Sequence, residues 1–373
     1  MKKITIITMQ LKTPGGIERF VSTLATMFSD DFTVEIAANY GKPTDKLAFP
    51  LPSNIQLSFL TPKQPQEVSM KNLIKSLKWY KIPKELKRRY GIHNSQHKAF
   101  RTFLKSLDTN YIITDRALYS SFVGKYYHGH ATKIATDHNY HQNSQKYVHT
   151  LLKSIKKFNY LILSTKELRD FYQSLTSVKC IFINNPLAQI PTKKSTLNSN
   201  NILSIGRFVP EKDFETLVEV MSEIHKQKPN VHLTIIGDGI TMPQIKHKIS
   251  TFNLEKVISL PGFLNQSDIQ KYYYNSSIFV MTSKTEAFGL VLTEAMSYGL
   301  PCIAFARASG ARAQITKNIG ILIQNPSAKQ MASAVIDLLD NHAKLLEYQS
   351  NINQAIQKYS ISQVRDNWRK VVQ

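Results

Sequence analysis

The stretch Asn201-Ile-Leu-Ser-Ile-Gly-Arg-Phe-Val-Pro-Glu-Lys-Asp-Phe-Glu-Thr-Leu-Val-Glu-Val-Met-Ser-Glu-Ile-His225 contains a strand pattern, a polar loop and a helix pattern in succession. In the last part, apolar residues recur at 214, 217, 218, 221 and 224, which is the spacing of one helix face. The β-branched run 231–236 comes next and predicts another strand. A strand, a helix and a strand in this order predict a βαβ unit of a parallel sheet.

The same alternation extends in both directions from this unit. Further strands are expected at 4–9, 33–38, 111–114, 132–136, 160–163, 179–183, 257–260, 278–281, 301–304 and 319–323. Helices are expected at 17–28, 117–125, 145–157, 166–174, 290–298 and 331–339. Residues 184–200 contain Pro186 and Pro191, lack any periodicity and are interpreted as a linker. The fold class is therefore predicted as α/β, with two Rossmann-like domains facing across a cleft.

Length and composition agree with two globular domains. The 373 residues exceed the usual size of one core, and 42% hydrophobic with 20% charged residues is typical of folded proteins. The apolar run 4–9 is too short for a signal peptide or a spanning helix, so a cytoplasmic protein is expected. Cys180 and Cys302 each lie in an apolar run and are expected to be core thiols.

The formal net charge of +22 points to an anionic partner. Residues 71–105 carry eleven Lys and Arg residues and one acid, Glu85, interspersed with apolar residues such as Trp79 and Tyr80, and Pro83 interrupts any single long helix there. This composition fits adsorption on an anionic membrane, and a merely solvated surface remains the alternative. Nucleic acid is disfavoured as a partner because zinc-finger, RNP-like and helix-turn-helix patterns are all lacking in the sequence.

Two segments carry the residues that suggest chemistry. In 204–213, Gly206 allows close backbone approach, and Arg207 and Lys212 provide two cations suited to a diphosphate, with Asp213 expected as the helix N-cap. Solvated surface cations are the alternative interpretation. In 283–296, Glu286 and Glu294 lie eight positions apart, and Glu294 falls on an otherwise apolar helix where a carboxylate needs hydroxyl or amide partners.

These segments together resemble the family 4 glycosyltransferases of GT-B fold. The resemblance rests on Gly206-Arg207, Glu211-Lys212 and the Glu286/Glu294 spacing. Further matches follow in the family's order, namely Gly15-Gly16-Ile17-Glu18-Arg19, His138, Gly237-Asp238-Gly239, Leu260-Pro-Gly-Phe263 and Gly299-Leu-Pro301. The resemblance spans nearly the whole chain and implies that residues 1–183 form an acceptor-side domain, on which a terminal helix at about 357–373 packs back, and residues 184–356 a nucleotide-sugar domain.

The resemblance also implies a role for each matching position. Arg207 and Lys212 would bind the donor diphosphate, Glu294 the ribose hydroxyls and Glu286 the transferred sugar. The remaining positions have supporting roles: Gly206 and Gly16 in loops at the diphosphate, the amides of Ala287, Phe288, Gly289 and Leu290 at sugar and phosphate, His138 at the sugar from the opposite wall, and Phe263 or Leu264 at the base.

The implied activity is a metal-independent, retaining transfer of a hexose or N-acetylhexosamine from a nucleotide sugar, with UDP-sugar preferred. The acceptor would be a glycan, a lipid-linked sugar or a cell-surface polysaccharide, with the enzyme peripheral on the inner face of the plasma membrane. The alternatives are a noncatalytic GT-B partner subunit and a nucleotide-sugar epimerase. No cofactor or metal is expected, because the sequence lacks a compelling DxD motif and its histidines lack zinc-ligand spacing.

Two further segments limit the interpretation. Gly237-Asp-Gly239 lacks the third glycine of a dinucleotide fingerprint, so NAD binding is disfavoured and a tight turn explains the glycines. After Ser309-Gly310 the chain has Ala311-Arg-Ala-Gln-Ile315, where many family members carry an acidic residue, and no role is assigned to this loop.

Overall fold

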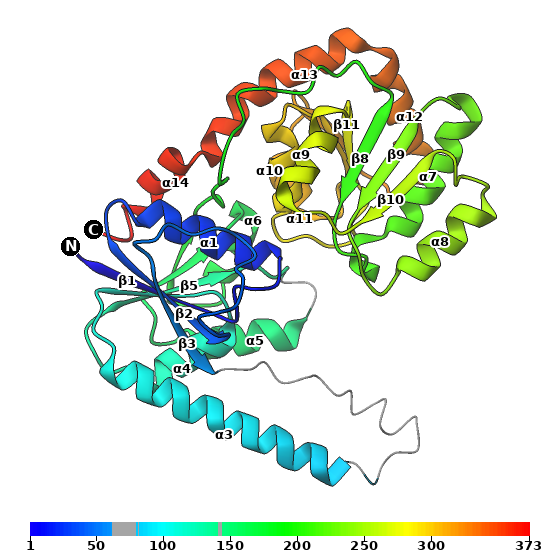
Figure 1. The fold of residues 1–373 in the computed structure, drawn as a ribbon. Coiled ribbons are helices and arrows are strands. Elements are labelled where there is room, and N and C mark those ends of the chain that lie inside the picture. The colour runs from blue at the N-terminus through cyan, green and yellow to red at the C-terminus, as the bar shows by residue number, and fades with distance from the viewer. Residues whose placement is uncertain (62–79, 81, 141–143) are drawn as a thin grey trace.

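The computed structural model describes residues 1–61, 80, 82–140 and 144–373, which form two α/β units joined by an extended connection (Figure 1). In the described residues, seven parallel strands form the first sheet and six form the second. These two Rossmann-like sheets confirm the predicted fold class. A search of the described residues finds no helix both long and apolar enough to cross a membrane.

The first sheet has the strand order β3-β2-β1-β4-β5-β6-β7. Its centre is fully buried because both faces are covered by helices, and Ile6 of β1 pairs with Ile36 of β2 on one side and Ile113 of β4 on the other. The elements of this unit are β1 (Lys3–Thr8), α1 (Gly16–Phe28), β2 (Thr33–Tyr40), β3 (Gln56–Thr61), α3 (Ile82–Ser106), β4 (Tyr111–Thr114), α4 (Ala117–Tyr126), β5 (Thr132–Asp137), α5 (Gln145–Ser154), β6 (Tyr160–Leu163), α6 (Lys166–Gln173) and β7 (Lys179–Phe182).

The second sheet has the order β10-β9-β8-β11-β12-β13. Its strands and helices are β8 (Asn201–Ile205), a 3₁₀ turn (Pro210–Lys212), α7 (Phe214–Gln227), β9 (His232–Ile236), α8 (Met242–Thr251), β10 (Ile258–Gly262), α9 (Gln266–Tyr274), β11 (Ile278–Met281), α10 (Leu290–Ser297), β12 (Cys302–Phe305), α11 (Ser309–Gln314), β13 (Gly320–Ile323), α12 (Ala328–Asp340) and α13 (His342–Ala355). A second 3₁₀ turn (Ile356–Tyr359) then leads to α14 (Ile361–Trp368).

Both sheets follow the Rossmann order 3-2-1-4-5-6, with β7 added to the first. In this order the chain direction across the sheet reverses beside the first strand, between β1 and β4 in one unit and between β8 and β11 in the other. Ligands of open α/β sheets bind at that switch point, outside the carboxyl ends of the strands. The two switch points are therefore the places to examine for a site.

The last helix returns to the first unit. The Trp368 ring of α14 meets the Phe28 ring of α1 edge-on, with 5.5 Å between the centroids. Arg365 and Arg369 pair with Asp30 and Asp31 just beyond α1. The chain termini thus lie beside each other on the first unit (Figure 1).

Some elements differ from the sequence expectations. Strand β3 was not expected because most of its residues are only partly buried and its pattern is weak. Helix α3 begins at Ile82, so Pro83 lies in its first turn, where a missing N–H costs nothing. The part of the basic segment at 71–79 and 81, which includes Trp79, lies outside the described residues. Cys180 and Cys302 are buried free thiols, as predicted.

Candidate functional site

The loop between β8 and α7 is held tightly against the neighbouring β9–α8 loop. Gly206 N donates to Ile236 O at 3.0 Å, and Phe208 N donates to Asp238 O at 2.8 Å. A Cβ on Gly237 would lie 1.9 Å from Gly206 O, and one on Gly239 would lie 2.3 Å from Phe208 O. The Gly-Asp-Gly segment is therefore more than a tight turn, because only glycine lets its backbone support the loop that carries Arg207.

Arg207 extends from this loop at the carboxyl end of β8. Its side chain is exposed, and within the described residues it has no hydrogen bond or ion pair. Burial raises the pKa of Glu18 at the first turn of α1, and the positive charges of Arg116 and Arg207 partly oppose that rise. Arg207 thus lies at the C-terminal unit's switch point and faces the N-terminal unit.

Lys212 and Glu286 meet directly. The Lys212 ammonium forms an ion pair with the Glu286 carboxylate, and both side chains are about four-fifths buried, at 18% and 19% exposed. Lys212 ends the 3₁₀ turn, whose carbonyls are fixed from the β11 side: Lys284 N donates to Glu211 O at 2.7 Å. The two motifs found in the sequence therefore form one cation–carboxylate site.

Arg307, just after β12, braces the two loops that carry this pair. Its guanidinium donates to the Asp213 carboxylate at 2.6 Å, to Thr282 O at 2.6 Å and to Ser283 O at 3.3 Å. Asp213 was expected to cap α7, and it does occupy the N-cap position. The predicted N-cap is thus confirmed. The Asp213 backbone is left-handed (φ 54°), and its side chain makes no capping hydrogen bond because Arg307 engages the carboxylate.

The start of α10 is supported from below by α11. Gly289 is the N-cap of α10 with φ +81°, a conformation that favours glycine. Gln314 donates to Phe288 O, and Gly310 N donates to Glu286 O at 2.9 Å. The segment after Ser309, to which the sequence assigned no role, thus forms α11 and holds the residues from Glu286 to Leu290 in place.

Across the cleft, the N-terminal unit approaches this helix end. A Cβ on Gly16 would lie 3.7 Å from the Leu290 side chain, and Ala287 packs into the N-terminal unit's core cluster. The first N–H groups of a helix lack intrahelical partners and favour anions. The N-terminus of α10 and Gly16 therefore border the same space.

Glu294 has partners in both units. Its carboxylate forms an ion pair with Arg19 of α1 at 3.0 Å and accepts a hydrogen bond from the Tyr273 hydroxyl at 3.4 Å. Burial raises the pKa of Glu294, and the positive charge of Arg19 and the Tyr273 hydrogen bond oppose that rise. The partner that the sequence required for this carboxylate is thus supplied by Arg19 of the N-terminal unit.

Phe263 and Leu264 follow β10 at the edge of the C-terminal unit. Phe263 is 61% exposed, which is unusual for an aromatic side chain, and the preceding Gly262 has φ +80°. Gly262 O accepts from Gly237 N at 3.0 Å, so this loop adjoins the one that supports Arg207. Leu264 is partly buried on the domain core.

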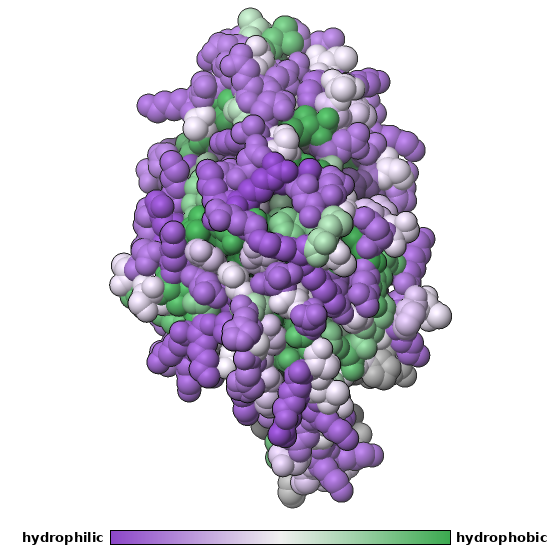
Figure 2. Space-filling model, turned by 90° about the vertical axis from the view of Figure 1, so that its left-hand side faces the viewer, coloured by the Kyte–Doolittle hydropathy of each residue, from purple (hydrophilic) through white to green (hydrophobic). Residues whose placement is uncertain are grey.

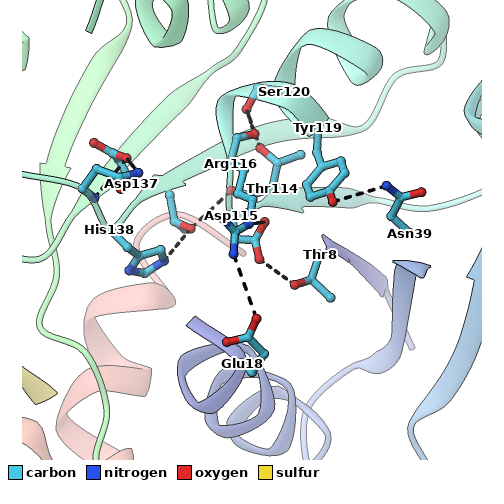
Figure 3. Close-up of polar contacts among 12 residues, drawn as sticks. Thr8, Glu18, Asn39, Thr114, Asp115, Arg116, Tyr119, Ser120, Asp137 and His138 are labelled. Carbon is cyan, nitrogen blue, oxygen red and sulfur yellow. Dashed lines mark hydrogen bonds and ion pairs between the residues drawn. The ribbon is translucent and has the colours of Figure 1, made fainter. Parts of the chain in front are cut away.

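The carboxyl edge of the first sheet, here called the N-terminal wall, carries the charged residues drawn in Figure 3. Asp115 follows β4 and is 1% exposed; it accepts a hydrogen bond from Thr8 of β1 at 2.6 Å, while its other oxygen has no hydrogen-bond partner in the described residues. Arg116 comes next and lies 4.0 Å from both Asp115 and Glu18. Burial raises the pKa of Asp115 to about 7, opposed by the Thr8 hydrogen bond and by Arg116.

His138 follows β5 on the same wall. Its Nε2 lies 3.1 Å from the Thr136 hydroxyl, and its ring packs on Phe20 with 4.4 Å between the centroids. Burial and the positive charge of Arg116 lower the pKa of His138 to about 4, so the imidazole is neutral at pH 7. A small cavity behind it is lined by residues that include Ser164 and Trp368.

The structure thus divides the expected residues between two walls. The C-terminal wall brings together Gly206, Arg207, Lys212, Glu286, Ala287, Phe288, Gly289, Leu290 and Glu294, and Gly16 meets it from α1. His138 lies on the N-terminal wall, where Arg116 is the neighbouring charge. Metal-binding groups of three or more His, Cys, Asp or Glu are not found in the described part of the chain.

Sequence reasoning missed Arg19, Asp115, Arg116, Arg307 and Gln314. A charged residue directly after a predicted buried strand was a usable signal for Asp115 and Arg116, because β4 was predicted with its correct ends. Arg307 and Gln314 contact residues more than twenty positions away, so local patterns contain no sign of them.

Two Rossmann-like units whose sheets meet at their carboxyl ends define the GT-B class of proteins. Residues 188–359 match the family model described as Glycosyl transferases group 1. The resemblance seen in the sequence is thereby confirmed.

Solved structures agree with the fold. The structure of an S. aureus TarM mutant in complex with fondaparinux, alpha-GlcNAc-glycerol and UDP matches with a TM-score of 0.81 at 17% identity, covering 99% of both chains. Sucrose-phosphate synthase from Thermosynechococcus elongatus matches with a TM-score of 0.80 at 16% identity, covering 100% of this chain and 98% of that one.

Several curated relatives are bacterial glycosyltransferases. A poly(ribitol-phosphate) alpha-N-acetylglucosaminyltransferase of Staphylococcus aureus is 28% identical over 65% of this chain and 50% of its own length. A Campylobacter jejuni enzyme, N-acetylgalactosamine-N,N'-diacetylbacillosaminyl-diphospho-undecaprenol 4-alpha-N-acetylgalactosaminyltransferase, is 24% identical over 91% of both chains. For several relatives, the match spans only about half of their length.

Proposed function

We propose that this protein is a retaining, metal-independent glycosyltransferase that transfers a hexose or N-acetylhexosamine from a UDP-sugar. The single observation that carries the proposal is the site at the β8/β11 switch point. There Arg207 is exposed, Lys212 forms an ion pair with Glu286, and α10 begins directly after Gly289. Two cations and a helix dipole in one place suit the diphosphate of a nucleotide sugar.

The chemistry follows from the charge that develops during bond cleavage. Breaking the bond between sugar and phosphate leaves negative charge on the diphosphate and positive charge at the anomeric carbon. Arg207 and Lys212 stabilise the leaving group, a role that a divalent metal fills in other transferases. Retention would follow if a donor phosphate oxygen takes the acceptor proton on the face that the leaving group vacates.

The carboxylates have separate tasks in this proposal. Glu294 binds the ribose hydroxyls after exchanging its contact with Arg19, and Glu286 orients the transferred sugar while holding Lys212. The exposed Phe263 supplies an apolar surface beside the base, with Leu264 next to it. His138, neutral at pH 7, faces the sugar from the N-terminal wall.

The acceptor is proposed to be a glycan, a lipid-linked sugar or a surface polysaccharide. The names of the relatives support this class, since they include a poly(ribitol-phosphate) and a diphospho-undecaprenol acceptor. The proposal is tested by incubating the pure protein with a panel of nucleotide sugars and measuring nucleotide release. We expect release with one UDP-sugar, and transfer of its sugar when acceptor is added.

The same assay separates the alternative functions. An epimerase would convert the nucleotide sugar without an acceptor, and a noncatalytic partner would bind it without releasing nucleotide. Absence of both binding and release with every nucleotide sugar would eliminate the donor site.

We further propose that α3 brings the enzyme to an anionic membrane surface on the cytoplasmic side. The described part of the basic segment carries Lys and Arg at 84, 87, 88, 89, 98, 101 and 105. Leu86 is 54% and Tyr90 is 68% exposed among these charges. The C-terminal part of α3 is anchored by Phe100, which stacks on Phe122 of α4 with 4.5 Å between the centroids.

The shape of the molecule supports this placement. The N-terminal end of α3 projects away from the body (Figure 1), and Figure 2 shows a narrow projection covered mainly by hydrophilic residues. Each basic residue near an anionic surface contributes about 1 kcal/mol.

Sedimentation with phosphatidylglycerol liposomes tests the membrane contact. We expect the double variant Lys84→Gln/Lys87→Gln to bind several-fold more weakly than the wild type, and more weakly than a matched control, Lys246→Gln/Lys256→Gln, whose lysines are exposed on the C-terminal unit. Equal sedimentation of the two double variants would refute a role for α3.

A further inference from the structure

Arg116 is a partly buried cation that lacks the contacts such a group normally has. Its side chain is 32% exposed, and its Nε atom is buried without a hydrogen-bond partner. Within the described residues its guanidinium makes no hydrogen bond at all, because Asp115 and Glu18 each lie 4.0 Å away. A guanidinium has five N–H donors in a planar fork, and buried donors are normally satisfied.

The place of Arg116 in the fold is that of a ligand residue. It lies at the carboxyl end of β4, beside β1, which is the switch point of the N-terminal sheet. Figure 3 shows its side chain between the Glu18 helix and the β4 strand end. Ligands of open α/β sheets bind at this position. At the switch point of the C-terminal sheet, Arg207 follows β8, the strand that corresponds to β1.

The helix that follows Arg116 adds a second attraction for an anion. Arg116 is the N-cap of α4 and makes no side-chain capping bond, and the first turn of α4 contains no acidic residue. The amides of Tyr119 and Ser120 both donate to Arg116 O, whereas those of Ala117 and Leu118 have no acceptor in the described residues. Free N–H groups and the positive end of the dipole at a helix start favour a phosphate.

The neighbouring carboxylates lie close enough to attract Arg116 but too far away to accept hydrogen bonds from it. Asp115 is fixed by Thr8, and its free oxygen faces Arg116 Nε across 4.0 Å. Glu18 is shared, because Arg116 and Arg207 both act on its carboxyl from opposite walls of the cleft. An anion that displaces Glu18 from the Arg116 fork would therefore lie on the N-terminal side of the donor.

We propose that Arg116, together with the N-terminus of α4, forms a subsite for a phosphate group carried by the acceptor. The inference rests on the proposed transferase function and adds the acceptor's chemistry to it. The donor diphosphate already has Arg207, Lys212 and α10 on the opposite wall, so a further phosphate is what remains for Arg116. The ligand is a phosphate ester, either in a soluble polyol-phosphate chain or at a lipid-linked diphosphate.

The test compares Arg116→Gln with Arg116→Lys, which keeps the charge but loses the fork. Arg169→Gln on the α6 surface is the matched control, because among the described residues Arg169 forms an ion pair with its neighbour Asp170 alone. Each protein is first titrated with UDP. Acceptor kinetics are then measured with a glycerol-phosphate oligomer, with a polyprenyl-diphosphate sugar in detergent micelles, and with phosphate-free analogues of both.

We expect Arg116→Gln to raise the KM for one phosphate-bearing acceptor by roughly 10- to 100-fold, the range of a charge-assisted fork contact. Arg116→Lys should be intermediate, and Arg169→Gln should match the wild type. The acceptor that responds identifies the source of the phosphate. KM for the phosphate-free analogues and the Kd for UDP should change less than twofold.

Several results would overturn the proposal. One is a wild type that uses phosphate-free acceptors as well as phosphate-bearing ones. Another is a variant whose UDP affinity falls as much as its acceptor affinity, which would assign Arg116 to the donor. A lower Tm with an unchanged acceptor KM would make Arg116 a structural counter-charge. If Arg116→Gln does not fold, Arg116→Lys decides by the same criteria. A wild type that does not bind UDP would instead refute the transferase function itself.

Discussion

The two walls of the cleft have the same sheet topology but are built differently at their switch points. On the C-terminal wall, Lys212 and Glu286 come from two contiguous motifs and are paired to each other. Their loops are fixed by hydrogen bonds from Arg307. On the N-terminal wall, Arg116 lies 4.0 Å from Asp115 and 4.0 Å from Glu18, and no hydrogen bond joins it to either carboxylate.

The difference shows which wall satisfies its charged groups with partners from the protein itself. The C-terminal wall satisfies most of its charges internally, so its geometry is fixed in advance, as electrostatic catalysis requires. On the N-terminal wall, one oxygen of Asp115 and the Nε of Arg116 have no hydrogen-bond partner among the described residues, so this wall still has hydrogen-bonding capacity for a ligand. Four variants can break or sharpen this comparison.

The largest effect is expected on the C-terminal wall from Arg207→Ala or Lys212→Ala. Either change removes a preorganised positive charge from the leaving diphosphate and should lower kcat by about 10²- to 10³-fold. Steady-state nucleotide release measures it, with Lys246→Ala as an exposed control for loss of a lysine charge. A loss below about threefold in both variants would mean that the cations are not preorganised for the leaving group.

The next effect concerns pH and the N-terminal wall. Asp115 has a pKa of about 7 in the folded protein, against ~3.9 for an unfolded aspartate. Between these values the native state holds a proton that the unfolded state has released, so this group's contribution to the free energy of unfolding falls as pH rises. The Asp115→Asn variant lacks this titration. Its free energy of unfolding, relative to that of the wild type, should therefore be about 2–4 kcal/mol higher at pH 8 than at pH 4.

Urea unfolding at the two pH values measures this difference. Asp108→Asn, an exposed aspartate on the same unit, serves as the control and should show little change between them. If the free energies of unfolding of wild type and Asp115→Asn change with pH in parallel, the pKa of Asp115 is not raised by burial.

The smallest effect is expected from the brace of the C-terminal wall. Arg307→Gln loses the bonds to Asp213, Thr282 and Ser283, and should cost about 2 kcal/mol because Arg307 remains 27% exposed. Calorimetry should show a Tm lower by about 4–8 °C for the C-terminal transition. Arg369→Gln, whose pairs lie on the surface near Asp31, is the control. A Tm equal to wild type would mean that the backbone alone fixes these loops.

Much of the C-terminal wall could be predicted from sequence because its residues are local. The strands β4, β6, β8 and β11 have the predicted ends, since short β-branched runs bounded by polar residues identify buried parallel strands. The pairing of Arg19 with Glu294 could not be predicted, because the two residues lie in different domains. The same holds for Arg307, which acts on a residue 94 positions away.

The sequence by itself determined the alternation of strands and helices, the α/β class and the residue types at the C-terminal switch point. These follow from hydrophobic periodicity and from motifs that are contiguous in the chain. Only the tertiary structure decided that Lys212 pairs with Glu286, that the Asp213 carboxylate binds Arg307, and that Arg116 Nε has no hydrogen-bond partner among the described residues. The reason is physical: the pairing and burial of a charge depend on which strand ends become neighbours, and strand order is not encoded locally.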